Sequence, residues 1–155
     1  MKGKIMVNSK RMSENADMLD KIYKNLKSGS DSMINAMSRV SGGELRGEMT
    51  AQLDGYEKYA GQVSKMIREQ GNTPKEEGLI SKLSSKLNMN LNTMTDTTDA
   101  HIAKVLINEA TAGVADMTGI VREFENTSCS EASLRLAREI AAFEENNIKD
   151  FKKFL

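Results

Sequence analysis

The chain has a single cysteine, Cys129, among its 155 residues. No intrachain disulfide and no thiolate metal cluster can therefore form, which fits a reducing compartment. The opening segment offers only Ile5, Met6 and Val7 as an apolar run, whereas a signal peptide needs about 7–15 apolar residues. No stretch approaches the ~18 apolar residues of a membrane span. We therefore expect a cytoplasmic protein without a transmembrane segment.

The chain has no excess of charge of either sign. It carries 22 Lys and Arg against 22 Asp and Glu, so its formal net charge is zero. Proteins that bind the phosphate backbone need a surplus of basic side chains gathered on one face. We therefore expect no nucleic-acid partner.

Proline and aromatic residues are scarce as well. With one proline, no tryptophan and 5% aromatic residues, the composition argues against a strand-rich sandwich. The 11 methionines and 39% hydrophobic residues are enough for a helical core. Apolar residues recur at a 3-4 spacing, which indicates amphipathic helices. This spacing predicts four helices, at about residues 13–41, 43–70, 74–125 and 129–155.

Glycines and capping residues mark the ends of these helices. Gly42-Gly43 and Gly71-Asn72 end the first two, while Thr73-Pro74 and Ser128–Glu131 have the residues of helix N-termini. Residues 95–99 form a Thr/Asp cluster that competes for backbone hydrogen bonds, so we expect a kink or a new start of the third helix there. Short connections favour antiparallel neighbours. We therefore predict a single all-α domain over residues 1–155, an up-down-up-down four-helix bundle.

Four segments carry a family resemblance: Leu26-Lys27-Ser28-Gly29-Ser30-Asp31-Ser32 through Val40, Glu44-Leu45-Arg46, the helix up to Gly71-Asn72-Thr73-Pro74, and Ile107-Asn108-Glu109-Ala110. Over about residues 15–155 the chain resembles the ferritin-like superfamily. It is most similar to a bacterial ferritin-like four-helix family described only as a domain of unknown function. The resemblance implies a bundle with a metal site at its centre, where members hold two irons or manganeses.

The ligands that this resemblance implies are a glutamate from each of two helices and a Glu-x-x-His from each of the other two. The chain departs from that pattern, because its only histidine is His101 and the residue three positions before it is Thr98. No Glu-x-x-His is present. We therefore expect no cofactor, no catalytic residue and no complete di-iron site.

Acidic residues on predicted apolar faces are nevertheless candidate metal ligands, because an unpaired buried charge is costly. Glu109 and Glu144 lie among apolar neighbours, and Asp31, Glu48 and His101 are outer candidates. Oxygen ligands of this kind suit manganese, magnesium or calcium better than zinc or copper. The alternative is that Glu109 and Glu144 lie at the edges of their stripes and pair with nearby lysines or arginines.

Three classes of function are compatible with these observations. The first is a non-catalytic structural or protein-interaction module, acting as a homodimer or larger homo-oligomer with an unknown protein partner. The second is a carboxylate-rich bundle that binds iron or manganese, with an oxidase, peroxide-handling or metal-storage role. A carrier of an apolar ligand, held between methionine-lined helices, is a third class. Of the two tyrosines in the second helix, we expect Tyr56 to be buried and Tyr59 to face solvent.

Overall fold

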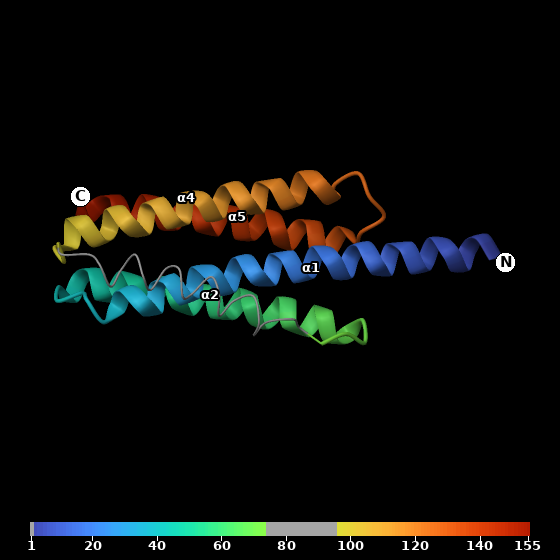
Figure 1. The fold of residues 1–155 in the computed structure, drawn as a ribbon, viewed down its shortest axis with the longest axis horizontal. Coiled ribbons are helices and arrows are strands. Elements are labelled where there is room, and N and C mark those ends of the chain that lie inside the picture. Colours follow the sequence, from blue (N-terminus) through green and yellow to red (C-terminus); the bar gives the residue numbers. More distant parts are fainter. Residues whose placement is uncertain (1, 74–95) are drawn as a thin grey trace.

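The computed structural model describes residues 2–73 and 96–155, and their side chains from Ser13 onward. This part of the chain folds into four α-helices and no strand: α1 (Lys2–Met37), α2 (Gly43–Glu69), α4 (Asp99–Phe124) and α5 (Glu131–Phe151), followed by the short 3-10 helix η1 (Lys152–Phe154). The four helices lie side by side (Figure 1). The predicted all-α four-helix bundle is confirmed.

The directions of the helices differ from the expected alternation. α1 and α2 form a hairpin in which the Arg46 guanidinium donates to the Val40 carbonyl, at 2.6 Å. α1 also runs antiparallel to α4, because Lys21 pairs with Glu123 near one end and Gly42 approaches Asp99 at the other. α2 and α4 therefore point the same way, and the order is up-down-down-up (Figure 1). The expectation from short connections fails here, because the end of α2 and the start of α4 lie at opposite ends of the bundle (Figure 1).

Two helix boundaries also differ from the predicted ones. α1 begins at Lys2, well before the first residues of the apolar stripe, and ends at Met37. The start predicted at Thr73-Pro74 lies outside the described residues. The break predicted in the third helix is confirmed, because residues 96–98 are not helical and Thr98 caps α4 by accepting a hydrogen bond from the His101 N–H, at 3.3 Å.

The apolar stripes meet in one core. Its fully buried large apolar side chains come from all four helices: Met18, Leu19, Ile22, Leu26, Leu45, Met49, Ile67, Ile102, Met117, Ile140 and Phe151. The expectation that Tyr59 faces solvent is wrong, and one apolar side chain at helical spacing, Ile34, lies outside the core. Ile34 is 50% exposed although it continues the stripe of α1, and Tyr59 is half-buried because its ring packs on Phe143, 5.3 Å between centroids. None of the described helices combines the length and apolarity needed to cross a bilayer.

The N-terminus of α5 is held by a serine two positions later than the sequence suggested. Ser130, not Ser128, is the N-cap, and its hydroxyl accepts from the Ser133 N–H at 3.2 Å. Asn15 of α1 ties this cap to the bundle, since its Oδ1 accepts from the Ser133 hydroxyl at 2.7 Å and from the Ser130 hydroxyl at 3.1 Å. The cap thus joins α1 to α5.

Ser130→Ala is expected to lower the free energy of unfolding by about 1–2 kcal/mol, because the cap and one bond to Asn15 are lost together. Chemical denaturation monitored by circular dichroism measures this. Ser128→Ala is the matched control and should change stability by less than about 0.5 kcal/mol. Equal effects of the two substitutions would contradict the assignment of Ser130 as the cap.

Candidate functional site

A layer of polar side chains crosses the middle of the otherwise apolar bundle. It consists of buried residues of three helices: Asn25 of α1, Gln52 and Tyr56 of α2, and Glu144 and Asn147 of α5. Gln52 links two of these helices, because its amide donates to the Asn147 carbonyl at 3.4 Å and to the Glu48 carboxylate at 2.9 Å. Buried polar groups at the centre of a bundle lower the stability of the fold unless they form hydrogen bonds or bind a ligand.

Glu144 is the most deeply buried acid among the described residues, with 1% of its surface exposed. Burial, together with the charge of Asp116 on α4, raises its pKa to about 8. The carboxyl group is therefore mostly neutral at pH 7. Its Oε2 has no hydrogen-bond partner in the structure. Gly113 leaves the room for this oxygen, since a Cβ at that position would lie 3.0 Å from it.

Asn25 presents a second unpaired acceptor. Its amide nitrogen donates to the Gly113 carbonyl at 3.0 Å and to the Asp116 carboxylate at 2.9 Å. These two acceptors fix which end of the amide carries the nitrogen, so the Oδ1 atom is the other end. That oxygen is buried and has no partner.

Tyr56 closes the layer on the α2 side. Its ring packs edge-on against Phe143, 5.0 Å between centroids, and lies directly on Gly29 of α1. Burial raises the pKa of the hydroxyl well above its usual value, and the charge of Glu144 adds to this, while the nearby amide of Asn147 opposes it. The hydroxyl therefore stays protonated at neutral pH.

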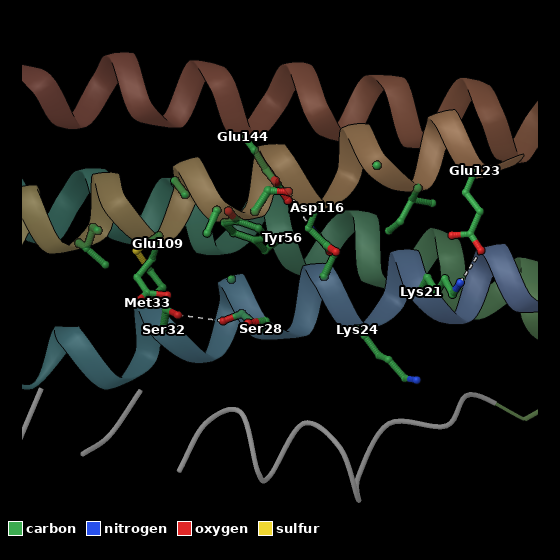
Figure 2. A pocket seen from close by; sticks show the side chains of 18 residues that line it. Lys21, Lys24, Ser28, Ser32, Met33, Tyr56, Glu109, Asp116, Glu123 and Glu144 are labelled. Carbon is green, nitrogen blue, oxygen red and sulfur yellow. Dashed lines mark hydrogen bonds and ion pairs between the residues drawn. The ribbon is translucent and has the colours of Figure 1, made fainter. Parts of the chain in front are cut away.

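A cavity of about 690 Å³ opens beside this layer, between α1 and α4. Figure 2 shows that Glu109, Asp116 and Glu144 reach it from one side and that Lys21 pairs with Glu123 at one end. The Lys21–Glu123 distance is 2.7 Å, and this hydrogen bond raises the pKa of the Lys21 ammonium. Apolar walls come from Met33, Leu106, Ala110 and Ile120.

The structure brings two of the predicted site residues together. Glu144 and Glu109 both line the cavity, and burial raises the pKa of the half-buried Glu109. The other three do not line it: Asp31 is half-buried on α1, Glu48 is bound to Gln52, and His101 lies in the first turn of α4. Metal binding by these five residues stays a prediction.

The dinuclear centre that the family resemblance implies does not fit the residues present. Glu144 is followed three positions later by Asn147, so an amide stands where a Glu-x-x-His has its imidazole. Within the described residues, no group of three or more His, Cys, Asp and Glu side chains could hold a metal ion. The orphaned oxygen of Glu144 thus has no imidazole beside it, and Asp116 is the one acid in the described part of the chain whose charge acts on it.

Sequence reasoning missed the two asparagines of the layer. Asn25 lies on the α1 stripe between Ile22 and Leu26, and Asn147 is one helical turn after Glu144. Both stand at positions where the 3-4 spacing predicts an apolar residue. That interruption of the stripe was the available signal.

Comparison with solved structures identifies the fold. The chain is similar to a Dps1 mutant of Mycobacterium smegmatis, with a TM-score of 0.74, 17% identity and coverage of 93% of this chain and 96% of that one. A dodecameric thioferritin from Bacteroides fragilis, described as bacterioferritin-related, gives a TM-score of 0.73 at 14% identity, covering 99% and 92%. Dps92 from Deinococcus radiodurans gives 0.57 at 14%, covering 94% and 87%.

These likenesses show that the chain has the ferritin-like fold. No protein-family model and no curated protein matches the sequence. The narrower resemblance to a family of unknown function therefore finds no support in the comparisons.

Proposed function

We propose that this chain is a ferritin-like subunit that assembles into a homo-oligomer and acts through protein contacts, without a dinuclear metal centre. The observation that carries the proposal is the polar layer itself. This layer holds one carboxyl group, Glu144, and three amides, Asn25, Gln52 and Asn147, where a two-metal site needs several carboxylates and imidazoles.

Two features support assembly into an oligomer. The first turns of α1 extend past the ends of the other described helices, where none of those helices packs on them (Figure 1). Ile34 of α1 and Leu155 at the C-terminus are large apolar side chains that are 50% and 63% exposed. The thioferritin with the same fold is dodecameric. A cytoplasmic location and a single domain, both expected from the sequence, belong to the same proposal.

The test combines mass and metal measurements on the full chain. Light scattering after size exclusion is expected to give a multiple of the 17.1 kDa chain mass. Elemental mass spectrometry after growth in iron- and manganese-supplemented medium is expected to find well under one metal per chain. A monomer in solution would contradict the assembly.

The metal-binding alternative predicts a different result in the same measurement. If iron or manganese co-purifies near one per chain, Glu109→Gln/Glu144→Gln should abolish its retention. The matched control is Glu139→Gln/Glu145→Gln, which changes two exposed acids on α5. Metal lost only from the first variant would overturn the proposed absence of a metal centre and would call for oxidase and peroxide assays.

A further inference from the structure

Two buried oxygens without a hydrogen-bond partner belong to side chains that line the same cavity from different helices. They are Oε2 of Glu144 on α5 and Oδ1 of Asn25 on α1, both in side chains more than nine-tenths buried. The amide of Asn25 cannot be turned to offer a donor, because its nitrogen is already held by Gly113 and Asp116. Leaving such atoms unpaired destabilises a fold. The pair therefore indicates a ligand that supplies donors.

The charges around the cavity have the sign that suits a cation. Glu109, Asp116 and Glu144 line its wall, and Asp116 is close enough to Glu144 for its charge to act on that carboxyl group. Of the two lysines at the cavity, Lys21 is bound to Glu123 and also pairs with Asp17 at 3.6 Å. Glu109 and Asp116 thus outnumber Lys24, the other lysine of the wall, even while Glu144 is neutral.

Part of the cavity wall is apolar. Met33, Leu106, Ala110 and Ile120 line it together with the acids. Its volume of about 690 Å³ lies in the range of small-molecule sites, about 300–1,000 Å³. A ligand that fills it has a charged donor head and an aliphatic body.

We propose that this cavity binds a primary aliphatic amine, with the ammonium group between Glu144, Asp116 and Asn25 and the alkyl chain against the apolar wall. An ammonium group has three N–H donors and no acceptor, which matches the orphaned oxygens. An alcohol offers one donor and no charge. A bare metal ion would need a richer set of ligands than the described residues supply.

Binding of the ammonium group changes the protonation of Glu144. The free protein holds a proton on this carboxyl group, whereas the bound cation favours the carboxylate. The overall step is R-NH3+ plus Glu-COOH giving the R-NH3+/carboxylate pair plus one H+ released to solvent. Other titratable groups near Glu144 are Asp116 and Glu109 of α4 and Tyr56 of α2, and α1 contributes Lys21 and Lys24 at the cavity.

Isothermal titration calorimetry on the full chain at pH 7 tests the proposal with three probes: n-pentylamine, the neutral n-pentanol and manganese chloride. We expect pentylamine to bind at least tenfold more tightly than pentanol. Titration in phosphate and in MOPS, a tertiary amine, whose ionisation enthalpies differ, should show the release of close to one proton. Glu144→Gln should weaken pentylamine binding at least tenfold, while Glu145→Gln, an exposed neighbour, should leave it unchanged.

A second variant separates the loss of the binding site from a loss of folding. Ala112 is exposed at the cavity wall, so Ala112→Trp should block the cavity and abolish pentylamine binding while leaving the circular dichroism spectrum unchanged. Equal binding of pentylamine and pentanol would reduce the site to an apolar pocket and overturn the proposal. Binding of manganese alone, or of none of the probes, would overturn it as well. The oligomeric state is measured separately, so this result is independent of the proposed function.

Discussion

Glu144→Gln is expected to stabilise the protein markedly at pH 8 and to leave its stability almost unchanged at pH 4. The folded chain keeps a proton on Glu144 up to about pH 8, whereas the unfolded chain releases it near its ordinary pKa of 4.5. Folding therefore takes up a proton between these values, and stability falls as the pH rises through that window. A shift of this size corresponds to about 3–5 kcal/mol. Glutamine keeps the shape and has no charge to bury.

Thermal melts from pH 4 to pH 9, at one protein concentration, measure this effect. The melting temperature of Glu144→Gln should exceed that of the wild type by roughly 10 °C at pH 8, and the two curves should converge near pH 4. Glu145→Gln, exposed on the same helix, should follow the wild type at every pH. A difference that does not vary with pH would mean that Glu144 is not buried in its neutral form.

Gly29→Ala is expected to destabilise the protein by about 1–3 kcal/mol, although alanine is the better helix former by about 1 kcal/mol. The reason is the ring of Tyr56, because a Cβ on Gly29 would lie 2.5 Å from its Cε1 atom. The ring cannot retreat, since Phe143 packs against it. Packing therefore outweighs helix propensity at this position.

Gly61 supplies the control. It lies inside α2, and a Cβ added there would meet nothing within 4 Å, so Gly61→Ala should stabilise the protein by up to about 1 kcal/mol. Urea denaturation of both variants, together with Tyr56→Leu and the Gly29→Ala/Tyr56→Leu pair, gives a double-mutant cycle. If Gly29→Ala is destabilising to the same extent without the ring, the contact with Tyr56 is not the cause.

The amino-acid sequence determined the class of the fold. The 3-4 spacing that runs through Leu19, Ile22 and Leu26 is a local property, because residues three and four apart share one face of a helix whatever surrounds it. The break before α4 was equally local, since Thr98 caps the helix with its own side chain. Glu109 and Glu144 were found in the same way, as acids on apolar faces, and both line the cavity.

Tertiary structure decided what no local pattern contains. The parallel course of α2 and α4 depends on which ends of the bundle residues 70–98 connect, and the cap of α5 at Ser130 depends on Asn15, far away in the chain. The raised pKa of Glu144 and the unpaired oxygen of Asn25 arise only when the packed helices exclude water from the polar layer. Burial and pairing are properties of neighbours in space, and a single sequence specifies those neighbours only through the complete fold.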